Sequence, residues 1–242
     1  MANRTVVEGI SAREGRTYLD VSHGTDTVSF VSPLFGYNTY FSVGDAITQA
    51  GLEKPTMAQN ASLAHAAWQN PREKYSADII EKMRSNWLWS FNGIFYVPKE
   101  GAYIQDRPAI VGNVLSMSRD ELVKKLESRD SSVRFVPFAD ICTGQLSDYS
   151  DLAKNKFVIA LAGAEGADKL AETASHYRRK PYVWALTETA SEQKRVASLS
   201  SDWDDYYRLF VYGGRLDVDG YRSGSVDFGC AFGVSPASEL AA

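Results

Sequence analysis

The chain has 242 residues, of which 44% are hydrophobic and 23% are charged, and its formal net charge is −4. This composition is typical of a soluble globular protein. Acidic residues outnumber basic ones and the Lys and Arg residues are not clustered, so we expect no nucleic-acid partner. No apolar stretch is long enough to cross a bilayer and no signal peptide follows Met1, so we also expect no membrane insertion.

In chain order, the first hundred residues predict short strands and helices separated by Gly and Pro. Strands are expected at 5–9, 17–21 and 27–31, and helices at 43–50, 57–69 and 76–84. Pro33 and Gly36 interrupt the segment 32–42, which is expected to be an aromatic loop. The segment 86–97 has apolar residues on both faces and predicts a central hairpin that turns at Asn92 and Gly93.

The next part of the chain continues this mixture. Ser118 and Glu121 match a capping box at the start of a helix, and an amphipathic helix is expected at 166–177. Strands are expected at 133–138, 157–161 and 182–186, and loops at 139–156 and 187–199. Because no repeat or linker divides the sequence, we predict an α+β fold with a single domain, residues 1–242.

Polar and apolar residues alternate in the C-terminal segment 200–236. A period of two places successive side chains on opposite faces of an extended segment. Gly220 and Gly224 bracket the expected turn, so the pattern predicts a strand–turn–strand ribbon. Its core face would consist of Leu216, Val218, Val226 and Phe228, and its solvent face of Arg215, Asp217, Asp219, Tyr221, Ser223, Ser225 and Asp227.

Glycine-containing motifs in the same segment resemble the C-terminal end of a C-type-lectin fold. They are Tyr212-Gly213-Gly214, Arg222-Ser223-Gly224 and Phe228-Gly229-Cys230-Ala231-Phe232-Gly233-Val234. More narrowly, they resemble the variable proteins of diversity-generating retroelements, including those of archaeal viruses, over roughly the last quarter of the chain. The resemblance implies a C-type-lectin-like core, a hypervariable ribbon at 200–236 that binds a ligand, and a location on a virion or a cell surface.

We therefore interpret the segment 200–236 as a ligand-binding face, since Tyr, Ser, Gly, Asp and Arg are common in recognition surfaces. The predicted site contains the solvent-facing residues of the ribbon together with Asp204, Asp205, Tyr206, Tyr207 and Tyr212. Its ligand would be a protein or a glycan on a target cell or virus surface, bound without a cofactor. The aspartates of this face slightly favour a basic partner surface.

No catalytic residues are predicted, because the sequence has no P-loop, no G-x-S-x-G elbow and no H-E-x-x-H motif. Asp217 and Asp219 match only the start of a calcium loop, so we expect no bound metal. Formylglycine-generating enzymes share the fold that the tail resembles, but they need two reactive cysteines near the C-terminus. This tail has only Cys230, and we expect it and Cys142 to be buried and reduced. Two alternatives stay open: an enzyme that acts on glycans through the acidic cluster, and a structural virion subunit.

Overall fold

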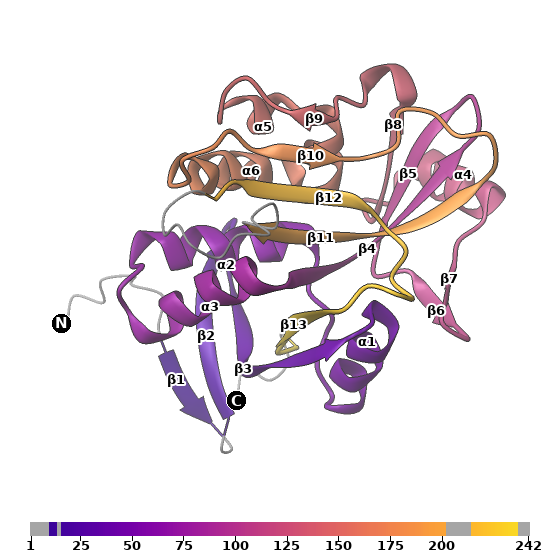
Figure 1. The fold of residues 1–242 in the computed structure, drawn as a ribbon. Helices are drawn as coiled ribbons and strands as arrows, with labels where there is room; N and C mark the ends of the chain where they lie inside the picture. The colour runs from indigo at the N-terminus through magenta and orange to yellow at the C-terminus, as the bar shows by residue number, and fades with distance from the viewer. Residues whose placement is uncertain (1–9, 14–15, 202–213, 237–242) are drawn as a thin grey trace.

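Strands and helices alternate irregularly along the chain in the computed structural model, which describes residues 10–13, 16–201 and 214–236 (Figure 1). The strands are β1 (Ile10–Arg13), β2 (Arg16–His23), β3 (Asp26–Asn38), β4 (Trp87–Val97), β5 (Gly101–Asp106), β6 (Ala109–Val111), β7 (Val114–Ser116), β8 (Val133–Pro137), β9 (Gly144–Gln145), β10 (Tyr182–Trp184), β11 (Gln193–Ser201), β12 (Leu216–Arg222) and β13 (Gly229–Val234). The helices are α1 (Tyr40–Gln49), α2 (Met57–Gln69), α3 (Lys74–Ser85), α4 (Arg119–Glu127), α5 (Asp151–Lys154), α6 (Lys156–Ser175) and the 3₁₀ turn η1 (Phe138–Asp140).

A mixed sheet with the order β1-β2-β3-β13-β4-β11-β12-β10-β9 runs through the molecule, and β5 and β8 extend it from β4. The strand β4 is buried along its whole length because it pairs with β13, β11 and β5. The predicted central position of this segment is therefore confirmed. The pair β6–β7 forms a separate small hairpin.

The predicted turn at Asn92 and Gly93 is wrong, because β4 continues through both residues. Gly93 is required by packing rather than by a turn. A Cβ atom on Gly93 would lie 2.6 Å from the sulfur of Met117 and 2.7 Å from a ring carbon of Pro108. An Asn-Gly pair thus indicates a hairpin only where the backbone has room to reverse.

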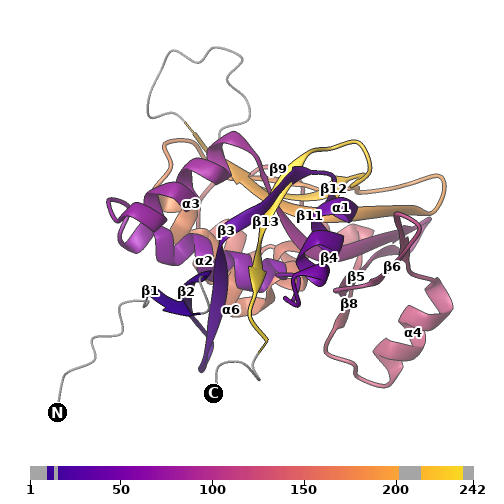
Figure 2. The ribbon, with the colours of Figure 1, turned by 90° about the horizontal axis from the view of Figure 1, so that it is seen from below.

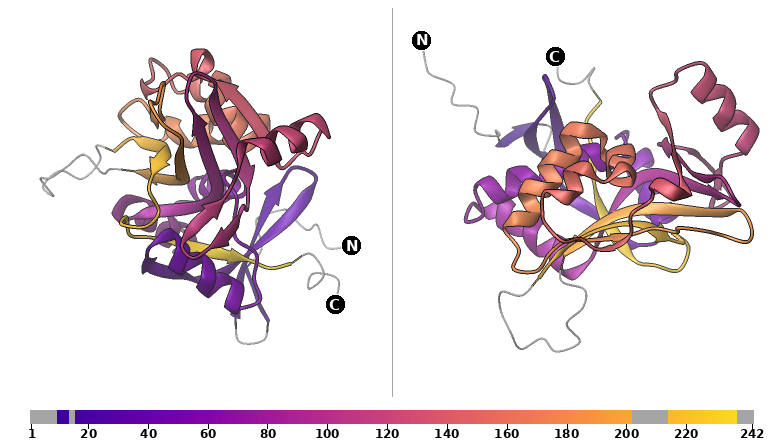
Figure 3. Two further views of the ribbon diagram at one scale, coloured as in Figure 1. Left: turned by 90° about the vertical axis from the view of Figure 1, so that its right-hand side faces the viewer. Right: turned by 90° about the horizontal axis from the view of Figure 1, so that it is seen from above.

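One face of the sheet packs against α2 and α6, which lie against each other. Seen from below and from above, α6 lies on one side of β11 and β12 (Figures 2 and 3). Leu88 of β4, Leu199 of β11 and Val218 of β12 are paired in register, and all three are fully buried in the core on that side. On the opposite face α1 covers the sheet near β4, where the ring centroids of Tyr40 and Trp89 are 5.8 Å apart.

The predicted helices are found, with small shifts at their ends. The helix expected at 57–69 is α2, and it begins with a capping box in which Thr56 and Gln59 bond to each other's backbone N–H groups. The helices expected at 43–50 and 76–84 are α1 and α3. The helix after Ser118 is α4, but the Ser118 side chain makes no capping hydrogen bond, so this capping box is not formed.

Two predicted segments have the wrong secondary structure. The strand expected at 157–161 is the first part of α6, which starts where Asn155 accepts hydrogen bonds from the backbone of Phe157 and Val158. Because this part of α6 is buried under the sheet, its sequence is apolar on nearly all sides and has no helical period to detect. The loop expected at 187–199 contains β11, a central strand whose start, Gln193–Arg195, is polar and half-buried.

The other predicted strands agree with the structure where it describes them. Those expected at 17–21, 27–31, 133–138 and 182–186 lie in β2, β3, β8 and β10. The aromatic segment 32–42 continues β3 and then starts α1, and the segment 139–156 holds η1, β9 and α5. The strand expected at 5–9 lies outside the described residues. Over the described ranges, none of the helices is both long enough and apolar enough to pass through a bilayer.

Candidate functional site

The C-terminal segment forms two strands that are not neighbours in the sheet. β12 lies between β11 and β10, whereas β13 lies between β3 and β4. The predicted strand–turn–strand ribbon is therefore wrong as a pairing. Gly220 lies inside β12, where a Cβ atom would come within 2.5 Å of the Phe157 ring. Both β12 and β13 run parallel to β4, so the loop 223–228, in which Gly224 has a φ of 76°, carries the chain across the sheet to a parallel strand and does not form a hairpin turn.

β12 keeps the predicted alternation of side chains but not the predicted exposure. Leu216 and Val218 are fully buried, as expected. Asp217 and Asp219 point to the other face, yet only 4% and 1% of their surfaces are exposed. The prediction that these two aspartates face solvent is wrong because β12 is an interior strand with a neighbour on each side.

Each buried aspartate lies between an aromatic residue of β10 and a serine of β11. The register gives two rows across the three strands: Tyr182-Asp217-Ser200 and Trp184-Asp219-Ser198. Among the described residues, the buried Ser198 hydroxyl has no hydrogen-bond partner. Two short rows that each contain a buried aspartate and a buried serine therefore cross the sheet at β12.

Arg215 covers the first row. Its Nε atom donates a hydrogen bond of 2.7 Å to Asp217 Oδ1. Its guanidinium carbon lies 4.4 Å from the centre of the Tyr182 ring and 6.0 Å from that of Trp184. The arginine thus neutralises a buried carboxylate and stacks on aromatic rings at the same time, two contacts for which a planar guanidinium is suited.

Arg222 plays the same part for the second row. Its Nε atom donates a hydrogen bond of 2.6 Å to Asp219 Oδ2, and its guanidinium carbon lies 4.1 Å from the Trp87 ring centre. Asp219 also accepts a hydrogen bond from the backbone N–H of Tyr221. Burial outweighs these contacts and raises the pKa of Asp219 to about 6.

We call this surface the arginine–aromatic face. It consists of Trp87, Tyr182, Trp184, Ser198, Ser200, Arg215, Asp217, Asp219 and Arg222. Because its carboxylates are buried and ion-paired, the groups that are partly exposed to solvent are the guanidinium of Arg222 and the rings of Tyr182 and Trp184. The Arg215 side chain is only 11% exposed, and Trp87 is buried. Among the described residues, the two aspartates that were predicted to attract a basic partner are therefore not accessible to a ligand.

Six residues of this face were not predicted as site residues: Trp87, Tyr182, Trp184, Ser198, Ser200 and Arg222. The signal in the sequence was weak but present. Tyr182 and Trp184 flank Val183 with a period of two, which places both rings on the face opposite the core. Nothing in the sequence indicates that Trp87, far away in the chain, would lie under Arg222.

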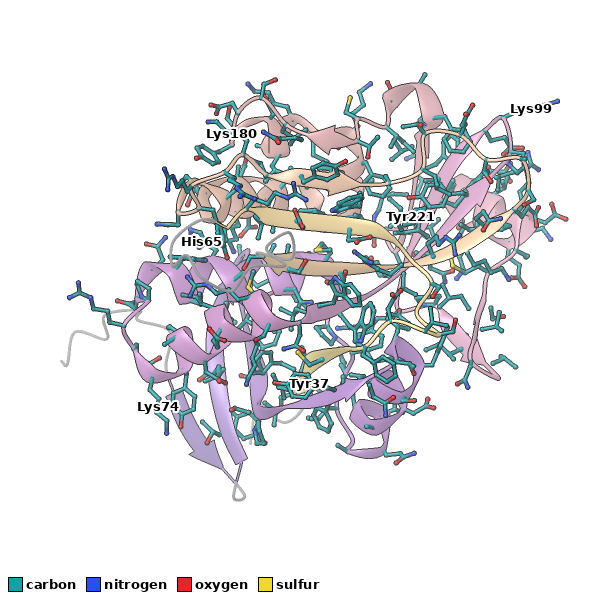
Figure 4. All side chains as sticks on the ribbon, viewed as in Figure 1. Tyr37, His65, Lys74, Lys99, Lys180 and Tyr221 are labelled. Atoms are coloured by element: carbon teal, nitrogen blue, oxygen red, sulfur yellow. The ribbon has the colours of Figure 1, made fainter. Side chains whose placement is uncertain are left out.

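The end of β12 and the loop after it carry the most exposed large side chains of the described C-terminal segment. Tyr221 is 46% exposed, Val226 is 72% exposed and Phe228 is 60% exposed. Figure 4 shows Tyr221 where β12 ends and the loop begins. The prediction that Val226 and Phe228 belong to the core is wrong, because β13 starts only at Gly229 and neither residue lies in a strand.

The remaining predicted residues divide into three groups. Ser225 is exposed, as predicted. Ser223 and Asp227 are half-buried, and the Asp227 carboxylate accepts a hydrogen bond from the backbone of Ser223 across the loop. The predicted site residues Asp204, Asp205, Tyr206, Tyr207 and Tyr212 lie outside the described residues. We use the name exposed loop for Tyr221, at the end of β12, together with Ser225, Val226 and Phe228 of the loop 223–228.

Comparison with known proteins gives one informative result. No model of a known protein family matches the sequence, and no curated protein does either. A solved structure from work on the accommodation of massive sequence variation in Nanoarchaeota by the C-type lectin fold is similar, with a TM-score of 0.53. The similarity covers 88% of this chain and 100% of that chain, at 13% sequence identity.

The chain has the C-type lectin fold. The α+β class predicted from the sequence is thereby confirmed. Within this C-type lectin fold, β12 positions both surfaces. The buried aspartates of the arginine–aromatic face lie at the centre of β12, and the exposed loop begins at its end.

The described residues of this C-type lectin fold offer little for metal or thiol chemistry. They contain no group of three His, Cys, Asp or Glu residues that could hold a metal ion. Cys142 and Cys230 are both free, and Cys230 is buried as predicted, whereas the predicted burial of Cys142 is wrong because this residue is exposed. Burial raises the pKa of the Cys230 thiol to about 12, so this thiol is protonated at neutral pH and is a poor nucleophile.

Asp219→Asn tests the raised pKa of Asp219. An acid whose pKa is higher in the folded chain binds its proton more tightly there, so it stabilises the fold as pH falls. This stabilisation is lost as pH rises towards 6. Asparagine cannot ionise, so the stability of the variant relative to the natural chain should increase between about pH 4 and about pH 7, by at most roughly 3 kcal/mol. Urea unfolding at several pH values measures this difference, and a difference that does not depend on pH would contradict the raised pKa.

Proposed function

We propose that this protein binds a ligand through its C-terminal surface, and that this surface is diversified by a diversity-generating retroelement. The observation that carries the proposal is the contrast within β12 and the residues after it. The strand is buried and held by ion pairs, whereas the exposed loop holds a tyrosine, a valine and a phenylalanine in solvent. Large apolar side chains grouped on a surface are typical of interaction sites.

The buried and exposed residues can change independently. The core contacts of Leu216 and Val218 do not involve the exposed loop, so substitutions in the loop leave the sheet pairing intact. Loops on a rigid scaffold tolerate sequence change and often carry binding residues for this reason. A surface of this kind suits a process that changes the ligand-binding residues and preserves the fold.

Two further observations support the diversification. The motif from Phe228 to Val234 resembles the end of retroelement variable proteins, and the similar solved structure comes from work on massive sequence variation. The ligand we propose is a protein or a large glycan on a cell or virus surface. The arginine–aromatic face and the exposed loop supply aromatic and guanidinium groups, which are enriched at the energetic centres of protein interfaces.

The burial and the ion pairs of Asp217 and Asp219 favour a binding role over glycan hydrolysis. Asp217 and Asp219 are almost fully buried, and each is held by an arginine. A general acid or nucleophile has to reach its substrate, and neither carboxylate is free to do so. We therefore propose that the protein is not an enzyme.

Two display libraries test the proposal. One randomises the exposed loop (Tyr221, Ser225, Val226 and Phe228), and the other randomises buried positions of the same segment (Leu216, Val218, Asp219 and Gly229). We expect most members of the first library to stay protease-resistant, and we expect selection on unrelated target proteins to yield binders that differ in the loop. Most members of the second library should be degraded. Equal loss of folding in both libraries, or no binders from the first, would contradict the proposal.

A further inference from the structure

A pocket of about 640 Å³ opens where α2, α3 and the end of α6 meet. It is lined by Trp68, Pro71, Ala77, Ile80, Glu81, Arg84, His176, Tyr177, Arg178 and Gly214. The lining shares no residue with the arginine–aromatic face or the exposed loop. Figures 1 and 2 show α2 and α3 beside each other. The volume lies within the range of roughly 300–1,000 Å³ that is common for small-molecule sites.

Aromatic rings form one side of this pocket. The rings of Trp68 and His176 are stacked, with centroids 5.0 Å apart and an angle of 3° between their planes. Tyr177 meets Trp68 edge-on and accepts a hydrogen bond of 3.3 Å from the indole N–H. These contacts fix the orientation of the indole ring, and the His176 ring covers one of its faces, so Trp68, His176 and Tyr177 together form a preorganised aromatic side of the pocket.

The α3 side of the pocket combines apolar and charged groups. Ala77, Ile80, Glu81 and Arg84 follow one another at helical spacing, so they form a stripe along one side of α3. Ile80 is buried and supplies an apolar wall. Among the described lining residues, Glu81 supplies the one carboxylate, whose two oxygens can accept hydrogen bonds.

Two arginines give the pocket its charge. Arg84 comes from the last turn of α3 and Arg178 follows the end of α6, and both are exposed. Within the described ranges, neither guanidinium has an ion-pair partner, whereas Lys82 on the same helix pairs with Asp78. With one glutamate opposing them, the lining residues leave an excess of positive charge at neutral pH. Unpaired guanidinium groups beside a cavity are well suited to carboxylate, sulfate or phosphate groups.

We propose that this pocket binds a small ligand that carries a flat ring and an anionic group. The ring would lie against Trp68 and Ile80, and the anion would be held by Arg84 and Arg178. Nucleotides and aromatic carboxylates both offer this combination of groups. From the described part of the C-terminal segment, the pocket takes only Gly214, and it takes none of the residues of the arginine–aromatic face or the exposed loop, so this inference does not depend on the proposed function.

Isothermal titration calorimetry with phenyl phosphate is the test, with benzyl alcohol and inorganic phosphate as the two partial probes. We expect phenyl phosphate to bind more tightly than either partial probe. Arg84→Gln and Arg178→Gln should each weaken its binding about fivefold or more, because each removes charge-assisted hydrogen bonds. Arg72→Gln, an exposed arginine outside the lining, is the matched control and should change nothing.

Thermal unfolding of each variant shows that the fold is retained, which is expected for exposed positions. Titrations with adenosine monophosphate and with benzoate then distinguish the two ligand sources, and tighter binding of one of them identifies the class. The inference is overturned if phenyl phosphate, adenosine monophosphate and benzoate all fail to bind. It is also overturned if the double variant Arg84→Gln/Arg178→Gln binds phenyl phosphate as well as the natural chain does.

Discussion

Val218→Asp is expected to unfold the protein. Val218 is fully buried at the centre of β12 and lies in register with Leu199 of β11 and Val183 of β10, on the face that packs against α6. A carboxylate there would have no partner in an apolar core, which should lower the free energy of unfolding by more than about 4 kcal/mol. Circular dichroism during urea unfolding measures this loss.

Phe228→Ser is the matched control for Val218→Asp. Phe228 lies in the same C-terminal segment but is 60% exposed, so its removal should change the free energy of unfolding by less than about 0.5 kcal/mol. The pattern of alternation in the sequence predicts unfolding for both variants. Comparable destabilisation by the two substitutions would show that the loop is packed into the core, and would remove the basis for a separate binding surface.

Gly229→Val is expected to destabilise the protein by about 3 kcal/mol or more. Gly229 pairs with Trp87 of β4 at the start of β13. A Cβ atom at this position would collide with the carbonyl oxygen of Trp87 and lie 2.8 Å from the Trp89 indole. The carbonyl belongs to a central strand and cannot move without breaking the sheet pairing.

Ser225→Val controls for the larger side chain in Gly229→Val, since Ser225 is exposed in the loop and should tolerate valine. Differential scanning calorimetry of both variants compares their melting temperatures. A Gly229→Val melting temperature within a few degrees of that of Ser225→Val would contradict the close packing of β13 on β4. Gly233, the other glycine of the motif 228–234, is packed in the same way, since a Cβ atom there would lie 2.5 Å from Leu52. Such a result would therefore leave both glycines without a packing explanation.

Features that depend on local sequence were predicted well. The ends of α2 follow from Thr56, which caps the first turn, and from a run of helix-forming residues that ends before Pro71. The alternation in β12 correctly placed Leu216 and Val218 in the core. The glycine motifs near the C-terminus correctly indicated the C-type lectin fold, which the structural similarity shows.

Features that depend on distant partners were not predictable. Asp219 has the pattern of a solvent-facing residue, and only the pairing of β12 with β10 and β11 shows that it is buried. Phe228 has the pattern of a core residue, and its exposure follows from the place where β13 begins to pair with β3 and β4. The stacking of Arg222 on Trp87 joins two segments far apart in the chain, so no local pattern contains it.

The most direct test of the proposed function is to sequence the DNA that encodes residues 200–236, with its flanking regions, from many natural copies of the gene. Substitutions should concentrate at the codons of the exposed loop, Tyr221, Ser225, Val226 and Phe228, whereas Leu216, Val218 and Gly229 should be unchanged. A near-copy of this segment that differs at adenines, with a reverse transcriptase gene nearby, should accompany the variation. Substitutions spread evenly over buried and exposed codons, or flanking DNA that holds neither the near-copy nor the reverse transcriptase gene, would contradict the proposal.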